Sequence, residues 1–366
     1  MKNFNIFIII ILVYCLMSGS AFALKRVVLN LDKNGPGKKV LIYDDSGTIL
    51  KIKIDKDQDG FAERVQTYKK GQISSIKKDT DHDKKFDIYY YYQNRSLVSS
   101  TKDTNHNGII NVWTEFKNNM PVKQKQDKNE DGKIDTITLF NKGIPIEQKK
   151  DNDFDGKFDY FTFFNGTGQT IKISQDLNKD GKIDKIQLFN SGKLSKIKFD
   201  NNKDGYFETI QVYNKFPGSM ILYQDVNGDK HFDIISFYVN SILKKKKVDE
   251  NFDGNIDFIE YYRKQGSIEK SEEIRKGKIA ITWFYDEKGS LVQGREDKNS
   301  DGRIDNWYFY DKGILKSVEE DTNLDGKPDL WEEYDKTQTI VKRKKDLDFD
   351  GIADFVDVNT SDGNGS

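Results

Sequence analysis

The sequence has very little cysteine: Cys15 is the only one in 366 residues, and it lies inside the N-terminal apolar run 6–17. Lys2, that run and the small residues ending at Ala23 predict a secretory signal peptide over residues 1–23. The apolar run is too short for a comfortable membrane span. We therefore expect an exported protein (periplasmic, on the cell surface or secreted). After removal of the signal it has neither a disulfide bond nor a membrane span.

Histidine is also scarce, which bears on catalysis. The three histidines, His82, His106 and His231, all lie in a repeated acidic phrase, where we expect them to face solvent. The sequence contains no Gly-rich phosphate loop and no zinc motif. A glycosidase could use paired carboxylates, but all such pairs belong to the repeat. We therefore predict no enzyme activity, no catalytic residue and no organic cofactor.

Apolar residues and proline are few for a chain of this length. Hydrophobic residues make up 36%, charged residues make up 33%, and there are five prolines. This composition argues against two ordinary hydrophobic cores, although the length would allow two domains. The aromatic content of 13% is nevertheless too high for a disordered chain. A thin core beneath a large exposed surface fits both facts.

The sequence does contain a nine-residue acidic phrase, written "DKNEDGKID" at 127–135 and repeated along the chain. Successive copies are 24 or 25 residues apart, with one step of 48, and weak copies lie at 32–40 and 272–280. We interpret residues 24–357 as one continuous array of about 14 repeats and residues 358–366 as a flexible tail. The 12 strong copies begin at Asp55, Asp79, Asp103, Asp127, Asp151, Asp176, Asp200, Asp225, Asp249, Asp297, Asp321 and Asp346.

Between the phrases the pattern predicts β-hairpins. In residues 134–151 apolar and polar residues alternate, then Asn141-Lys142-Gly143 gives a tight-turn signal before a second, more polar strand. The predicted fold is all-β: tandem antiparallel hairpin repeats of about 24 residues in an elongated single-layer meander or solenoid. The alternative is a seven-bladed β-propeller, since 28 strands would make seven blades of four. A propeller should show a 48-residue period, which is absent here, so we favour the open meander.

Aromatic residues form a ladder at the end of the first strand in every strong repeat but the last. We interpret this ladder as the packing seam between neighbouring hairpins, with a glycan-stacking face as the alternative. Trp283 falls in the repeat that contains the weak copy 272–280, and its position relative to the ladder is left open. The ladder residues are Tyr68, Tyr92, Phe116, Phe140, Phe164, Phe189, Tyr213, Tyr238, Tyr262, Tyr310 and Tyr334.

The acids of the phrase predict metal sites. Positions 1, 3, 5 and 9 of the 12 strong copies provide 48 places, and 38 of them hold Asp or Glu out of 60 in the chain. Like charges this close repel, and a calcium ion with six to eight oxygen ligands removes that cost. Glycine at position 6 suits the sharp turn, whereas Lys84 and Lys230 at that position indicate strained turns. We expect several calcium ions, up to about 12 in one chain, each held by one strong copy.

The predicted ligands are, copy by copy, Asp55, Asp57, Asp59 and Glu63; Asp79, Asp81, Asp83 and Asp87; Asp127, Asn129, Asp131 and Asp135; Asp151, Asp153, Asp155 and Asp159; Asp176, Asn178, Asp180 and Asp184; Asp200, Asn202, Asp204 and Glu208; Asp225, Asn227, Asp229 and Asp233; Asp249, Asn251, Asp253 and Asp257; Asp297, Asn299, Asp301 and Asp305; Asp321, Asn323, Asp325 and Asp329; and Asp346, Asp348, Asp350 and Asp354. The copy at 103–111 has one acid, and it is the best candidate for an Asx-rich turn without metal.

The phrase matches the first nine positions of the EF-hand calcium loop. Position 12, where EF-hands have glutamate, holds residues such as Thr138, and the flanks are strands. The phrase therefore resembles the calcium loops of integrin-alpha FG-GAP repeats and of thrombospondin type 3 repeats, and the hairpin spacing resembles MORN-type repeats. These resemblances imply an exported, bacterial-type calcium-binding protein with an extracellular role, and they name no partner.

Two function classes follow from these observations. The first is an exported calcium-binding repeat protein with a structural, adhesive or surface-binding role, in which calcium stabilises the fold. The second is a propeller-type recognition domain that binds a glycan or a protein. Lysine-rich second strands indicate an anionic polysaccharide or another cell-surface component as partner, with no specific nucleic-acid site. Alternatively, these lysines only solvate the sheet and block edge pairing.

Overall fold

The structure, a computed structural model, describes residues 25–30, 37–213 and 218–358. The signal peptide, most of the weak copy at 32–40 and the tail beyond Val358 lie outside the described residues, so the predictions for them stay predictions. The described residues form 28 β-strands and no helix. They divide into two compact units, one ending at Gly181 and one beginning at Lys182.

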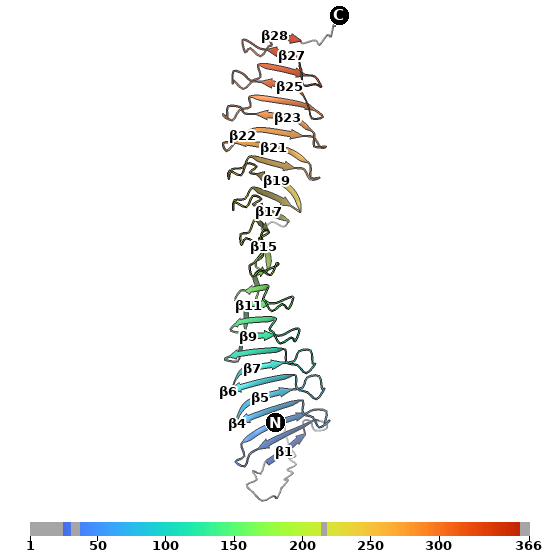
Figure 1. Cartoon of the computed structure of the whole chain (residues 1–366), viewed down its shortest axis with the longest axis vertical. Helices are drawn as coiled ribbons and strands as arrows, with labels where there is room; N and C mark the ends of the chain where they lie inside the picture. The colour runs from blue at the N-terminus through green and yellow to red at the C-terminus, as the bar shows by residue number, and fades with distance from the viewer. Residues whose placement is uncertain (1–24, 31–36, 214–217, 359–366) are drawn as a thin grey trace, which may run out of the picture. The chain divides into compact units, whose positions relative to one another are not determined.

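The strands of each unit are short and regularly spaced (Figure 1). The first unit contains β1 (Lys25–Asn30), β2 (Lys38–Tyr43), β3 (Ile49–Asp55), β4 (Arg64–Lys69), β5 (Gln72–Lys78), β6 (Ile88–Gln93), β7 (Ser96–Lys102), β8 (Val112–Lys117), β9 (Met120–Gln126), β10 (Thr136–Asn141), β11 (Ile144–Lys150), β12 (Tyr160–Phe164) and β13 (Thr170–Gln175). The second contains β14 (Lys185–Asn190), β15 (Lys193–Phe199), β16 (Thr209–Tyr213), β17 (Ser219–Gln224), β18 (Ile234–Val239), β19 (Ile242–Val248), β20 (Phe258–Tyr262), β21 (Ile268–Arg275), β22 (Lys278–Tyr285), β23 (Leu291–Glu296), β24 (Asn306–Asp311), β25 (Ile314–Glu320), β26 (Leu330–Tyr334), β27 (Ile340–Lys345) and β28 (Phe355–Val358).

Within each unit every strand pairs antiparallel with the next strand in the chain. The ladder runs without a break from β1 to β13 in the first unit and from β14 to β28 in the second. This confirms the antiparallel hairpin meander. The propeller alternative is wrong, because separate blades would interrupt the pairing after every fourth strand.

Two kinds of connection alternate along each meander. At one edge of the sheet, two-residue turns such as Lys142-Gly143 join β10 to β11, and both residues have positive φ, 48° and 80°. Turns of this type match the twist of paired strands, so the tight-turn prediction is confirmed. The pairing register shifts by one residue between Leu139 and Phe140, which places a β-bulge at the aromatic that closes the strand.

The acidic phrases form the connections at the other edge, and backbone hydrogen bonds join each phrase to the one before it. The N–H of Asp151, the first residue of its phrase, donates to the carbonyl oxygen of Asp135, the last residue of the preceding phrase, at 2.8 Å. The N–H of Asp135 in turn donates to the carbonyl of Gln126 at 2.9 Å. The acidic loops of a unit therefore follow one another in a row along a single edge.

The weak copy at 272–280 differs from the other loops. Strands β21 and β22 extend through this segment, and Arg275 pairs with Lys278 across a two-residue turn at Lys276-Gly277. Both turn residues have positive φ, 49° and 75°. This segment has no acid at positions 3, 5 and 9 of the phrase, and the chain closes it as an ordinary tight hairpin instead of a wide loop.

The core is thin, as the composition indicated. Among the described residues, the buried apolar side chains are Ile52, Ile76, Val112, Ile197, Ala280 and Ile281. Most of the other buried side chains are acids at positions 1 and 9 of the loops. The eleven ladder aromatics named above are all half-buried, which fits packing between hairpins and does not fit a fully exposed stacking face.

Candidate metal sites

The position-1 aspartate organises each acidic loop from the inside. Asp127 Oδ2 accepts a hydrogen bond from the N–H of Gly132 at 2.9 Å, and the same bond from position 1 to position 6 occurs in all twelve strong copies. Position 6 has a positive φ, 89° at Gly132, which glycine adopts at little cost. Lys84 and Lys230 take the same conformation with φ of 70° and 75°, so the predicted strain at these two turns is present.

The position-9 carboxylate accepts hydrogen bonds from backbone N–H groups near the start of its own loop. Asp135 Oδ2 accepts from the N–H of Lys128 at 2.5 Å and from the N–H of Asn129 at 3.2 Å. Positions 3 and 5 form Asx turns: the N–H of Asp131 donates to Asn129 Oδ1 at 3.2 Å, and the N–H of Lys133 donates to Asp131 Oδ1 at 2.8 Å. These bonds position the acids and use only part of their capacity, since each carboxylate has about four acceptor sites.

Burial divides the predicted ligands into an inner and an outer pair. Position 1 is buried in every copy except at Asp55, which is half-buried. Position 9 is buried except at Asp159 and Asp257, which are half-buried, and at Asp354, which is exposed. Positions 3 and 5 are exposed, apart from the half-buried Asn178. Each loop therefore has two fixed acids on its inner side and two side chains that face solvent.

Several of the predicted ligands lie close enough to share one cation. Single carboxylate oxygens within 4.8 Å of one another come from Asp55, Asp57 and Asp59, from Asp79, Asp81 and Asp83, and from Asp127, Asp131 and Asp135. Two oxygens on one calcium ion are at most about 5 Å apart, twice the usual ligand distance. These acidic clusters therefore have the spacing that a metal ion requires.

Within the described part of the chain, buried carboxylate oxygens without a hydrogen-bond partner include Asp127 Oδ1, Glu208 Oε1 and Asp233 Oδ1. Asp127 and Glu208 are 6% exposed, and Asp233 is 1% exposed. A buried charged oxygen without a partner is costly. All three belong to positions 1 or 9 of acidic loops, where a cation would supply the missing interaction. The residues present therefore fit a bound metal ion.

Electrostatic effects in the loop 151–159 show the same crowding of charge. Burial raises the pKa of Asp159, and the negative charges of Asp153 and Asp151 act in the same direction. Asp153 itself has a lowered pKa because of its hydrogen bond with Lys179. The inner carboxylate of this loop is thus destabilised as an anion, while the outer one has a cationic partner.

Position 4 is a functional position that the sequence analysis missed. It has positive φ in all twelve strong copies, and its side chain can reach the preceding loop. Glu130 Oε1 accepts from Asn105 Nδ2 at 2.6 Å, and Glu130 Oε2 accepts from Asn107 Nδ2 at 2.5 Å. The loop 103–111, which has Asp103 as its single acid, is therefore completed by a carboxylate from the next loop. The phrase carries no distinct signal for this role, because positions 2 and 7 vary along the chain as position 4 does.

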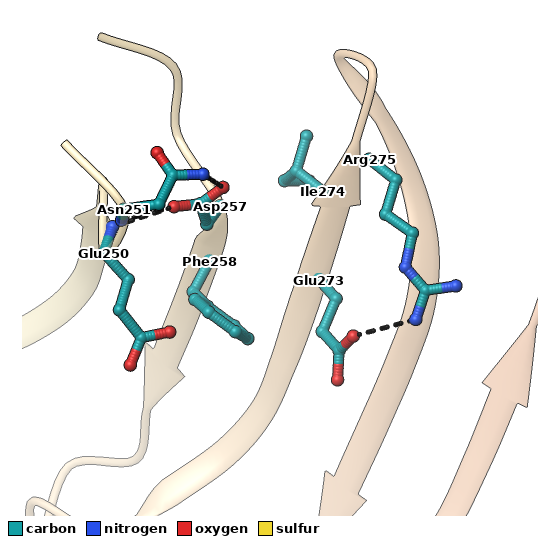
Figure 2. A pocket seen from close by; sticks show the side chains of 7 residues that line it. All are labelled: Glu250, Asn251, Asp257, Phe258, Glu273, Ile274 and Arg275. Atoms are coloured by element: carbon teal, nitrogen blue, oxygen red, sulfur yellow. Dashed lines mark hydrogen bonds and ion pairs between the residues drawn. The ribbon is translucent and has the colours of Figure 1, made fainter. Parts of the chain in front are cut away.

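A surface hollow lies where the acidic loops are interrupted. It has a volume of about 290 Å³ and opens between the loop that begins at Asp249 and the tight turn of β21 and β22. Figure 2 shows its lining, including the ion pair between Glu273 and Arg275 at 3.3 Å. The lining residues are Glu250, Asn251, Asp257, Phe258, Glu273, Ile274 and Arg275. Arg275 occupies position 4 of the weak copy at 272–280, but it lies in β21 and forms an ion pair with Glu273 of the same strand.

Many strand lysines pack over aromatic rings of the adjacent strand. Lys77 Nζ lies 5.2 Å from the ring centre of Tyr89, and Lys245 and Lys270 lie 4.9 Å and 4.3 Å from that of Tyr261. Lys245 and Lys270 are half-buried and Lys77 is exposed, and in each case the charge lies over an aromatic ring. The lysines thus contribute to packing, and the anionic partner expected from them stays a prediction.

No family model matches the chain, and no curated protein matches it. Two solved structures with some similarity are the crystal structure of TcdB2-TccC3, at 11% identity and a TM-score of 0.19, and that of TcdB2-TccC3-Cdc42, at 10% identity and a TM-score of 0.18. The matches cover 84% and 88% of this chain but only 20% and 24% of those chains. At such TM-scores the likeness supports no conclusion. The described residues include no helix long and apolar enough to cross a membrane.

Proposed function

We propose that this protein is an exported calcium-binding repeat protein whose bound ions stabilise a hairpin meander with a structural, adhesive or surface-binding role. The observation that carries the proposal is the loop 127–135. There the buried Asp127 Oδ1 has no hydrogen-bond partner, and carboxylate oxygens of Asp127, Asp131 and Asp135 lie within 4.8 Å of one another. The export and the surface role rest on the N-terminal signal predicted from the sequence.

Calcium is favoured over other ions because of the ligand chemistry of most loops. The ligands are carboxylate and amide oxygens, which are hard donors, and position 7 can add a backbone carbonyl. Magnesium demands a nearly ideal octahedron and keeps several of its waters, whereas calcium accepts six to eight oxygens in flexible geometry. Loops with two fixed inner acids and two solvent-facing outer groups suit calcium better.

The energetic argument comes from the thin core. There is no cysteine after Cys15, and few apolar side chains are buried. The meander therefore needs a source of stability other than disulfide bonds and hydrophobic burial. An ion that binds only the folded state adds RT ln(1 + [L]/Kd) for each site. Sites with Kd of about 10⁻⁴–10⁻³ M, as in extracellular modules, each contribute little, but a row of them contributes substantially.

The test is thermal unfolding of the full chain in chelator, in millimolar calcium and in millimolar magnesium. We expect a melting temperature higher by tens of degrees in calcium and a much smaller effect of magnesium. Asp127→Asn should reduce the number of bound calcium ions by about one. The matched control is Asp45→Asn, an exposed aspartate in a β-turn, which should leave the number unchanged. Identical melting curves in chelator and in calcium would contradict the proposal.

A further inference from the structure

Two histidines at position 4 lie beside the carboxylates of the preceding loop. His106 Nδ1 is 3.3 Å from Asp87 Oδ1 and 3.5 Å from Asp81 Oδ2. His82 Nδ1 is 3.9 Å from Asp57 Oδ2 and 4.0 Å from Glu63 Oε1. In each case the imidazole comes from the following loop, which starts 24 residues after the loop that the imidazole faces. All three ligand atoms of each group lie within 4.8 Å of one another.

The expectation that these histidines only face solvent was therefore incomplete. Their side chains are 40% exposed for His106 and 56% for His82, so each ring is accessible, yet Nδ1 points to two acids. His231, at position 7 of its loop, is 75% exposed and contacts only Asp229 of the same loop, at 3.2 Å. The difference follows from the position in the phrase, because position 4 reaches backward.

The inner acid of each group is fixed by the backbone. Glu63 is 6% exposed, and its Oε2 accepts from the N–H of Lys56 at 2.8 Å. Asp87 is 3% exposed, and its Oδ2 accepts from the N–H of Thr80 at 2.6 Å. The other oxygen of Asp87 faces His106. A ligand held in this way by burial and hydrogen bonds keeps its orientation when an ion binds.

The combination of one imidazole with two carboxylates differs chemically from the all-oxygen loops. Imidazole nitrogen is a good ligand for zinc and similar transition metals, whereas calcium prefers oxygen. Tetrahedral zinc holds nitrogen at about 2.0–2.1 Å and carboxylate oxygen at about 2.0–2.2 Å, so neighbouring ligand atoms are about 3.3–3.5 Å apart. The distances at His106 fall in that range, and those at His82 require a closure of about half an ångström.

We propose that the loops 55–63 and 79–87 form two mixed nitrogen–oxygen sites for a zinc-class transition metal, with His82 and His106 as the selecting ligands. The proposal deepens the function above, since it uses two of the same acidic loops. A water molecule completes each site, as in zinc sites with three protein ligands. Position 4 thus determines what the preceding loop binds. A carboxylate at Glu130 completes an acid-poor loop, and an imidazole changes the preferred metal.

The experiment uses the full chain and Zn²⁺ as the probe. The protein is equilibrated with about 50 µM Zn²⁺ in about 2 mM Ca²⁺, a calcium level above the range expected for the oxygen sites, then separated from free ions and analysed for bound zinc. We expect about two zinc ions retained in the native chain, about one in His82→Gln or His106→Gln, and almost none in the double variant. His231→Gln is the matched control and should retain about two.

A second readout distinguishes a lost ligand from a damaged fold. Each variant is also melted in calcium without zinc. The two single variants should keep the melting temperature of the native chain because both histidine side chains are accessible to solvent. Zinc content that is unchanged by the histidine substitutions, or that equals zero in the native chain, would overturn the proposal. In either case, calcium-dependent stability measured on the same sample would leave the function proposed above intact.

Discussion

The ammonium of Lys179 forms an ion pair with Asp153, the outer carboxylate of the preceding acidic loop. Lys179 is at position 4 of its own loop, as the zinc-selecting histidines are in theirs. The hydrogen bond from Lys179 lowers the pKa of Asp153, and Asp153 raises the pKa of Lys179. A side-chain cation therefore already neutralises part of the charge that an ion would neutralise in the loop 151–159.

The first prediction concerns this internal cation. Lys179→Met should strengthen calcium binding at the loop 151–159 by about tenfold, since it removes a competing positive charge beside four acids. The measurement is a calcium titration of the full chain by calorimetry. Lys157→Met, which removes an exposed lysine at position 7 of the same loop, is the control for net charge. An equal gain in both variants would show that only the overall charge matters.

The second prediction concerns high pH. Burial raises the pKa of Tyr308 to about 12, and its hydrogen bond to Glu296 acts in the same direction; the O–H donates to Glu296 Oε2 at 2.7 Å. The unfolded chain loses this proton near pH 10, earlier than the folded chain. The stability from Tyr308 is thus fully present below pH 10 and is lost as the pH rises toward 12.

The loss at Tyr308 should amount to about 1–2 kcal/mol after allowance for solvent screening. Denaturant unfolding at pH 8 and at pH 11 measures it, and Tyr308→Phe should show a smaller decrease between the two values. Tyr91→Phe, at an exposed ring, should decrease as the native chain does. A decrease in Tyr308→Phe as large as in the native chain would contradict this assignment.

The third prediction concerns Gly294, a glycine within a described strand that packs against the indole of Trp283. Gly294 of β23 is paired with Trp283 on one side and with Tyr308 on the other, and the two rings lie 6.0 Å apart. A Cβ at Gly294 would meet Trp283 Cζ3 and would lie 2.8 Å from its Cε3. The indole is also anchored, because its Nε1–H donates to Glu273 Oε1 at 2.8 Å.

Gly294→Ala should therefore destabilise the second unit by about 1–3 kcal/mol, as overpacking does, and should change the near-ultraviolet circular dichroism of the tryptophans. Gly166→Ala is a suitable control, since a Cβ there meets nothing within 4 Å and no positive φ is involved. Unchanged stability in Gly294→Ala would mean that the indole moves aside without cost.

The sequence by itself determined the repeat, its strands and its turns. The alternation in residues 134–151 and the pair Lys142-Gly143 specify a hairpin because their causes are local: side-chain direction alternates along a strand, and a two-residue turn needs positive φ. The acidic loops followed for the same reason, since ligands spaced at 1, 3, 5 and 9 belong to one short segment. Propeller and meander were harder to separate, as they differ only in which hairpins pair.

Only the tertiary structure decided what lies between loops. The step of 24 or 25 residues becomes a distance of a few ångströms when the loops form a row, so Lys179 and His106 meet acids of the preceding phrase. Glu130 meets asparagines of the preceding phrase in the same way. Sequence spacing within one phrase could not show this. The tight turn within 272–280 is the second such case. There the pairing of β21 with β22 extends the strands through a segment that has no acid at positions 3, 5 and 9 of the phrase.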